Sequence, residues 1–381
     1  MERFLRSFFH PGVLIMRRLR LSAKLISMMS MLLLPLLVLI VLTIDRYRAD
    51  LAFVRAEVQG THIVRALSEV VSLAQKHRGQ TNMVLSGNQA AQAPRDETRR
   101  KLDDALKQLD EVLRGEPDVG LAQDWAARRA ELARMVAGTL PGDRAEAFRF
   151  HTTQVNELNQ LIQLAAEKSG LLLDPEAPTF FLMDLSVERV PLWTEALGLL
   201  RGQGAGVLAS HQMSTAERSS LIGRAEGLSG NIQAIRTKLA ALQRAGEAAP
   251  GSTDQAVQVS EDFIKAVHAA FEGDSPVGES AAYFAAGTQA IERVQAFQGE
   301  ALNRLEALLE ARHSSLLRQF AFAMVLSVLG VLALLYAIAA FYRSFVGAMH
   351  AVHKAVSASA DGDLSQTAFI KGRDEVAMIG N

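Results

Sequence analysis

Two long apolar runs without a charged residue constrain this chain of 381 residues more than any other feature. The first covers residues 25–44 and the second covers residues 320–342. An α-helix of about 20 apolar residues crosses the ~30 Å hydrocarbon core of a bilayer. Pro35 lies inside the first run, and a membrane helix tolerates proline where a neighbouring helix satisfies the freed carbonyl. We therefore expect two transmembrane helices.

The basic residues before the first run predict which side of the membrane each part occupies. The segment 1–24 has one acidic residue, Glu2, and the basic residues Arg3, Arg6, Arg17, Arg18, Arg20 and Lys24. Because the side rich in Lys and Arg normally stays in the cytoplasm, we expect a bacterial inner-membrane protein with both ends inside and residues 45–319 in the periplasm. A cleaved signal peptide is the alternative. The apolar run is too long for one and Thr43 to Arg46 offers no small-x-small cleavage site, so we expect an uncleaved anchor.

The composition excludes several classes of protein. Lys and Arg number 40 against 41 Asp and Glu, which argues against a basic nucleic-acid binder, and 49% apolar side chains argue against a disordered chain. There is no cysteine, so disulfides, thiolate metal sites and thiol nucleophiles are excluded. We find no metal-ligand spacing, phosphate loop or nucleophile elbow. The sequence therefore predicts no cofactor, no metal, no nucleic-acid partner and no enzymatic activity.

The segment between the two runs has the pattern of helices. Apolar residues recur every three or four positions and alternation of period two is almost absent, which predicts an all-α domain. Gly, Pro and small polar residues divide it into eight helical segments, with breaks at 87–94, 115–120, 138–142, 174–178, 210–215, 246–252 and 273–278. The first and last segments continue into the apolar runs, so each should form one continuous helix. We expect an elongated helical bundle, built as two stacked four-helix bundles.

Polar residues interrupt an apolar stripe on the first long helix. Val64, Leu67, Val71 and Ala74 are followed at the same spacing by Arg78, Thr81 and Leu85. A buried guanidinium needs a partner. Arg78 and Thr81 therefore indicate a binding site for a small anion, since a guanidinium binds a carboxylate or oxyanion through two hydrogen bonds. The alternatives are a salt bridge to a carboxylate such as Asp184 or Glu188, or solvent exposure at a bundle junction.

A second candidate region covers residues 178–206. Arg189 and Arg201 fall in adjacent apolar stripes on the predicted helix, and Asp184 lies close to the first of them. Alternating glycines after Arg201 allow close approach of a neighbouring helix or of a ligand. Pro191 should kink the helix, which shapes a pocket or only adds curvature. We expect the scattered histidines to be surface or junction residues and both tryptophans to be packing residues, namely His62, His77, His151, His211, His268, Trp125 and Trp193.

The segment after the second apolar run carries a recognisable motif. Phe345, Met349, Val352 and Val356 have the spacing of a coiled-coil seam. An Asp-Gly-Asp-Leu turn follows at 361–364, and Asp374-Glu375 precedes a new apolar stretch. The segment 343–381 resembles an incomplete HAMP domain, the parallel four-helix signal converter of bacterial receptors. The resemblance implies that signal conversion depends on Gly362, Leu364, Ile370 and Glu375. The usual proline of the first HAMP helix is absent here.

The whole plan is similar to the sensory half of a methyl-accepting chemotaxis protein. That plan is a basic N-terminus, a span, an exported helical domain, a second span and a HAMP start. The resemblance implies a homodimer that binds a small molecule outside and acts on a chemotaxis kinase complex inside. If Arg78-Gly79 is like the corresponding part of nitrate-sensing or carboxylate-sensing domains, the ligand is a small anion. The input half of a histidine kinase or nucleotide cyclase is the alternative, and a structural membrane protein without a ligand is a third.

Overall fold

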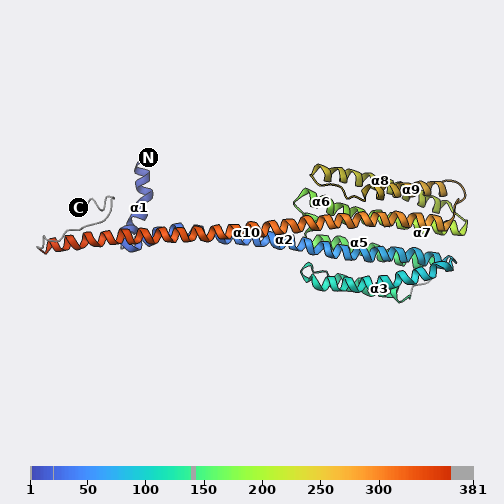
Figure 1. Ribbon diagram of the computed structural model, residues 1–381, viewed down its shortest axis with the longest axis horizontal. Coiled ribbons are helices and arrows are strands. Elements are labelled where there is room, and N and C mark those ends of the chain that lie inside the picture. Colours follow the sequence, from blue (N-terminus) through green and yellow to red (C-terminus); the bar gives the residue numbers. More distant parts are fainter. Residues whose placement is uncertain (1, 20, 139–142, 362–381) are drawn as a thin grey trace. The chain divides into compact units, whose positions relative to one another are not determined.

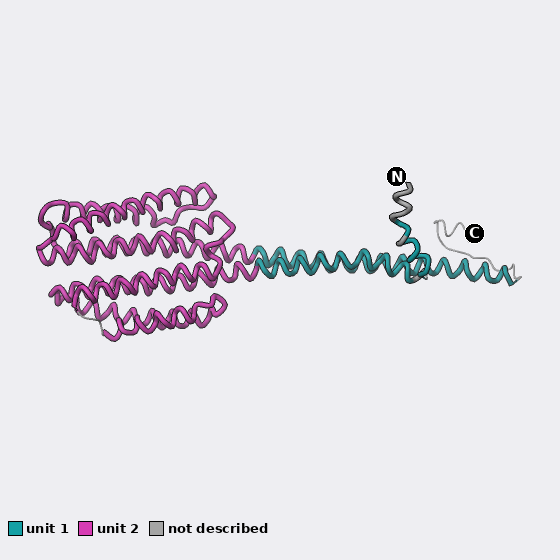
Figure 2. Tube along the Cα trace, turned by 180° about the vertical axis from the view of Figure 1, so that it is seen from behind, with its two compact units in different colours: residues 1–50, 315–381 teal, residues 51–314 magenta. Residues whose placement is uncertain are grey.

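The computed structural model describes residues 2–19, 21–138 and 143–361, and it confirms the all-α class. The described part contains no β-strand. The chain divides into two compact units, residues 1–50 with 315–381 and residues 51–314 (Figure 2). The α-helices are α1 (Glu2–Arg18), α2 (Leu21–Leu85), α3 (Gln92–Gly115), α4 (Ala122–Val136), α5 (Arg144–Lys168), α6 (Ala177–Met183), α7 (Val190–Ser210), α8 (Thr215–Arg244), α9 (Thr253–Phe271) and α10 (Ser280–Ala360).

The first unit holds α1, the start of α2 and the end of α10. Both long helices have apolar stretches of sufficient length to cross a membrane. Their apolar side chains point outward, with Met31 80% and Phe322 71% exposed. Outward-facing apolar side chains over such a length are what a lipid-facing helix presents. Continuous helices through 21–85 and 280–360 also confirm that no break separates either apolar run from the helix beside it.

The second unit is a bundle in which two sets of helices lie alongside one another. One set comprises the second part of α2 with α3, α4 and α5, and the other comprises α7, α8, α9 and α10 (Figure 1). The two sets lie beside each other rather than end to end, so the predicted stacking along the long helices is wrong. Partly buried polar contacts join α2 to α10 where the two sets meet, as between Gln295 Nε2 and Ser72 Oγ at 2.6 Å.

Local sequence signals account for where the helices begin and end. Ser214 and Glu217 form the reciprocal capping box that opens α8. Gly246 follows the end of α8 with a φ of 87°, a conformation that glycine adopts without strain. The apolar stripe of α10 is buried as its spacing predicts, through Ile291, Val294, Phe297, Ala301 and Leu305.

The break expected at Pro191 takes the form of a π-helix. Residues Asp184–Arg189 form this element between α6 and α7. Pro191 has no N–H to donate, so a carbonyl in the preceding turn loses its helical partner. Gln298 Nε2 on α10 donates to the carbonyl oxygen of Ser186 at 2.8 Å. The π-helix therefore ties α10 to the start of α7.

Candidate anion-binding site

Arg78 is buried on α2, with 1% of the residue exposed. Its Nη1 donates to Glu195 Oε1 on α7 at 2.6 Å, and its Nη2 donates to Glu195 Oε2 at 3.0 Å. Nη1 also donates to Thr152 Oγ1 on α5 at 3.1 Å. The Phe148 ring lies below the guanidinium, with 5.3 Å from Cζ to the ring centroid. The Arg78 guanidinium is thus fixed by its hydrogen bonds to the Glu195 carboxylate and by the face of the Phe148 ring.

Arg201 on α7 is also buried, with 2% exposed, but it has no carboxylate of its own. Its Nη1 donates to Thr288 Oγ1 on α10 at 3.0 Å, and its Nη2 donates to the Gln75 carbonyl at 3.3 Å. Its Cζ lies 4.8 Å from the centroid of the Phe284 ring. Within the described residues it forms no ion pair, and its Nε has no hydrogen-bond partner. Burial and the charge of Arg78 lower the pKa of Arg201 to about 9, so the group is still charged at neutral pH.

Gln75 joins the two arginines into one site. Its carbonyl accepts from Arg201, and its Nε2 donates to Glu195 Oε2 at 3.0 Å. Two buried guanidinium groups therefore lie close to one buried carboxylate, Glu195, and the exposed Glu292 on α10 also attracts the charge of Arg201. Among the described residues neither carboxylate forms an ion pair with Arg201, so its buried charge favours the binding of an anion. We call Arg78, Glu195 and Arg201 the anion site.

Two glycines let the guanidinium groups approach the helix backbones. A Cβ at Gly198 would lie 3.0 Å from Arg78 Nη2. A Cβ at Gly79 would lie 3.1 Å from the Phe284 ring and 3.4 Å from Arg201 Nη2. Larger residues at these positions would push the guanidinium groups away from the helices that hold them.

Of the residues proposed from the sequence, Arg78 and Arg201 come together and the others do not. Thr81 is 2% exposed, and its hydroxyl has no hydrogen-bond partner in the described part of the chain. Asp184 Oδ2 instead lies 3.6 Å from Arg189 Nε and 3.5 Å from Lys238 Nζ on α8. The alternative of a salt bridge from Arg78 to a carboxylate is therefore confirmed, with Glu195, but Asp184 as its partner is wrong. Asp184 starts the π-helix and faces α8, away from α2.

The salt bridge to Glu188, the other expected partner of Arg78, is also wrong. Glu188 accepts a hydrogen bond from Gln163 at 3.4 Å. Glu195 is the partner that sequence reasoning missed. It stands one helical turn before Gly198, and nothing local in the sequence distinguishes it from an exposed glutamate.

His77 and His151 are buried, so the expectation of surface histidines is wrong for this pair. His151 Nδ1 lies 2.7 Å from the Ala147 carbonyl, which only accepts, so this nitrogen is the donor. His151 Nε2 then accepts from His77 Nδ1 at 2.9 Å. Burial, followed by the charge of neighbouring groups, lowers the pKa of His77 to about 3 and that of His151 to about 4. Both rings are neutral at pH 7 and form a polar but uncharged wall beside Arg78.

A third arginine, Arg312, is largely buried further along the same two long helices, with 11% of its side chain exposed. Arg312 on α10 bonds to Glu57 Oε2 on α2 at 3.2 Å, to Asp174 Oδ1 at 2.9 Å and to Thr179 Oγ1 at 2.9 Å. Its Nε lies 2.9 Å from Glu176 Oε1. Burial, and next the charge of Asp174, raise the pKa of Glu57 to about 8. We call this group the Arg312 cluster, and here carboxylates outnumber the guanidinium.

The sequence did carry a signal for the Arg312 cluster. The stripe through Val64 continues backward at the same spacing through Thr61 to Glu57. The stripe on α10 continues forward from Leu305 to Arg312 in the same way. Extending each stripe by two turns would have placed both charges in the core.

The residues assigned to HAMP signal conversion, namely Gly362, Leu364, Ile370 and Glu375, lie outside the described residues. α10 continues as a helix to Ala360, so the segment from Phe345 to Val356 is helical as expected. Within the described ranges, no group of three or more His, Asp or Glu side chains is placed to hold a metal ion.

The fold and the buried site define a helical sensor domain joined to two helices that are apolar and long enough to cross a membrane. Residues 69–306 match the family model described as nitrate and nitrite sensing, NIT. The chain belongs to this family. A solved structure titled "Structure of the NasR transcription antiterminator" matches with a TM-score of 0.58 and 18% identity, covering 84% of this chain and 88% of that chain. At this identity the likeness shows the fold alone. No curated protein matches.

Proposed function

We propose that this chain is the input half of a membrane receptor that binds nitrate or nitrite at the anion site. The observation that carries the proposal is that two buried guanidinium groups lie together and that, among the described residues, only Arg78 forms an ion pair, with Glu195. Membership of the nitrate and nitrite sensing family supports the choice of ligand. A planar guanidinium offers paired N–H donors at the spacing of two oxygens of a small planar anion. The chain acts by binding and carries out no reaction of its own.

The helices around the site support a signalling role. Arg78 and Gln75 belong to α2, and Thr288, which accepts from Arg201, belongs to α10. An anion that draws Arg201 towards Arg78 changes the contacts of α7 with both long helices. A ligand with different affinity for two arrangements of these helices shifts the balance between them.

The output side of the proposal rests on the sequence. The resemblance of 343–381 to a HAMP start supports a homodimer that acts on a chemotaxis kinase complex. In that arrangement α10 leads from the periplasmic domain through the membrane to the converter.

The test is thermal and chemical unfolding of the full chain in nanodiscs with nitrate, nitrite, chloride and sulfate. A ligand at 100 times its dissociation constant stabilises the folded state by about 2.7 kcal/mol. We expect stabilisation by nitrate or nitrite, and a much smaller effect from equal concentrations of chloride and sulfate. Equal shifts with all four anions, or no shift with either nitrogen oxyanion, would contradict the proposal.

A further inference from the structure

Both arginines of the anion site are closed off from solvent. Arg78 is 1% exposed and Arg201 is 2% exposed, so an anion reaches them only if part of the domain opens. An opening requires a place where solvent comes close to a guanidinium and where one movable side chain separates the solvent from that guanidinium.

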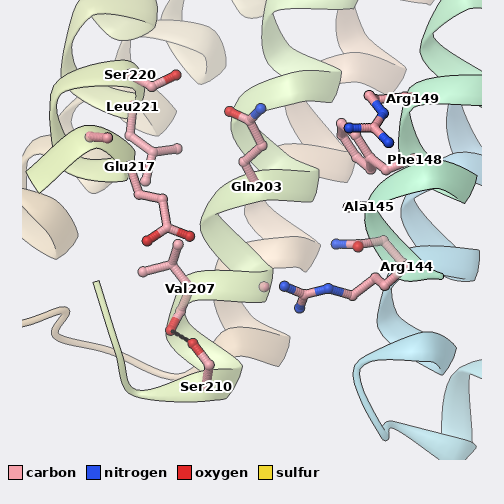
Figure 3. Close-up of a pocket in the computed structure, with 13 residues that line it drawn as sticks. Arg144, Ala145, Phe148, Arg149, Gln203, Val207, Ser210, Glu217, Ser220 and Leu221 are labelled. Carbon is pink, nitrogen blue, oxygen red and sulfur yellow. Dashed lines mark hydrogen bonds between the residues drawn. The ribbon is translucent and has the colours of Figure 1, made fainter. Parts of the chain in front are cut away.

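One cavity of the second unit meets this requirement. It has a volume of about 410 Å³ and lies between α5, α7 and α8 (Figure 3). Asn82 and Phe148 are among its lining residues. Asn82 stands one helical turn from Arg78 on α2, and the other face of the Phe148 ring belongs to the cation–π contact with Arg78. Among the described residues, Phe148 is the cavity-lining side chain that also contacts an arginine of the site.

A row of glycines on α7 lets the side chains between the cavity and the site pack directly against the helix backbone. Gly198, Gly202 and Gly206 follow one another at intervals of four residues, so they share one face of the helix. A Cβ at Gly206 would lie 3.4 Å from Asn82 Nδ2, and one at Gly202 would lie 3.2 Å from the Phe148 ring. Gly198 is the glycine that lies against Arg78. The Phe148 ring therefore packs on the α7 backbone between Asn82, which lines the cavity, and Arg78.

We propose that this cavity is the entrance to the anion site and that the Phe148 ring is its gate. The inference rests on the proposed function and adds the route and the gating residue. An anion enters between α5 and α8 and reaches Arg78 when the ring swings away from its place against Gly202. The ring then closes over the bound anion.

The charges at the mouth suit an anionic ligand. Arg144 and Arg149 are exposed on the α5 side of the cavity. Arg144 donates to the Ser86 hydroxyl at 3.0 Å, and neither Arg144 nor Arg149 forms an ion pair with a described residue. Glu217 faces them from α8, where Ser214 holds one of its oxygens in the capping box. Two cations against one partly engaged carboxylate attract anions to the opening.

The experiment is stopped-flow binding of nitrate to the full chain in nanodiscs, followed by tryptophan emission, with the equilibrium affinity from calorimetry. The variants are Phe148→Ala, Phe148→Trp and Gly206→Val. The matched control is Phe150→Ala, because Phe150 is also half-buried on α5 but contacts His151 and Arg134 instead of the cavity. If Phe148→Ala does not fold, Phe148→Leu replaces it, and Gly206→Val still tests the entrance.

We expect Phe148→Ala to raise the association and dissociation rate constants together, by about tenfold, since the ring packing and its cation–π contact no longer hold the entrance closed. Phe148→Trp and Gly206→Val should slow association, and Phe150→Ala should leave it unchanged. Nitrate binding at unchanged association rates in the Phe148 and Gly206 variants would overturn the gate alone. Absence of nitrate binding by the wild-type chain would overturn the proposed function and the gate together.

Discussion

The anion site and the Arg312 cluster both consist of arginine and acidic side chains, but positive groups predominate in the first and acidic groups in the second. Both place arginine in the apolar core of one bundle, and both join α2 to α10. In the anion site two guanidinium groups lie close to Glu195, whereas in the Arg312 cluster one guanidinium meets Glu57, Asp174 and Glu176. The difference shows that a buried arginine alone does not indicate a ligand site. An excess of positive charge around a buried arginine favours a site that binds an anion, whereas an excess of carboxylates favours an internal ion-pair cluster that only stabilises the fold.

The largest expected effect is on the stability that the Arg312 cluster contributes. Arg312→Ala leaves Glu57 and Asp174 buried without a cation, and breaking a buried ion pair in this way costs about 3–5 kcal/mol. Chemical unfolding of the full chain in detergent measures the loss. Arg236→Ala is the matched control, because Arg236 and Glu261 pair on the surface and such pairs contribute about 0–1 kcal/mol. Equal losses in the free energy of unfolding would show that the Arg312 cluster stabilises the fold no more than an ordinary surface ion pair.

The second prediction concerns pH and again separates the two regions. The folded pKa of Glu57 is about 8 against an ordinary 4.5, because burial and the charges of Asp174 and Glu176 outweigh Arg312. The folded state therefore binds the proton more tightly. The stabilisation is complete below pH 4.5 and is lost as the pH rises through 8.

Unfolding between pH 6.5 and 8 measures this effect, because groups with lowered pKa values act in the opposite direction only outside this range. His77 and His151 do so below pH 6.5, and Arg201, with a pKa of about 9, does so above pH 8. The free energy of unfolding should fall by about 1–2 kcal/mol across this range. Glu57→Gln imitates the protonated form and should flatten the curve. A slope that persists in this variant would show that Glu57 is not the group responsible.

The third prediction tests the role of the shared carboxylate. Glu195→Gln keeps the shape of the side chain but removes the negative charge that competes with a bound anion for Arg78. Nitrate affinity should rise by about tenfold, equivalent to about 1.4 kcal/mol. Calorimetric titration measures it, with Glu188→Gln as the control on a neighbouring turn. Weaker binding in Glu195→Gln would mean that the carboxylate positions Arg78 for the ligand rather than competing with it.

The smallest expected effect is on the glycine beside Arg78. Gly223 on α8 is exposed and has open space around it, so Gly223→Ala should stabilise the chain by about 0.5–1 kcal/mol. Gly198→Ala places a Cβ 3.0 Å from Arg78 Nη2, so the same gain in helix propensity should be cancelled. Parallel thermal melts compare the two. A full gain at Gly198 would show that Arg78 moves without cost.

Local patterns in the sequence were sufficient for most of the fold. The three- and four-residue spacing gave the buried faces of α2 and α10, and Gly, Pro and capping residues gave the ends of the helices. Side-by-side packing of the two helix sets was not predictable in this way. It depends on which faces of α2, α7 and α10 meet, and that choice is made by contacts between distant residues such as Gln298 and Ser186.

The candidate site shows the same limit. Periodicity identified Arg78 and Arg201 as charges near the core, because each interrupts or joins an apolar stripe. It did not identify Glu195, which is 117 residues from Arg78 and has no unusual neighbours in the sequence. Asp184 was favoured because it is close to Arg189 along the chain, and that closeness produced a local ion pair instead. Pairing across helices requires the register of two helices, which a single sequence does not provide.

Arg201 is buried and forms no ion pair with a described residue, and we propose that its charge makes this the place where a small anion binds. Isothermal titration of nitrate into the full chain tests it, comparing wild type with Arg201→Met and with Arg189→Met on the same stretch of helices. Loss of a buried, charge-assisted contact corresponds to at least roughly tenfold weaker binding, which we predict for Arg201→Met alone. Nitrate affinity that is unchanged in Arg201→Met, or reduced equally in both variants, would contradict the account.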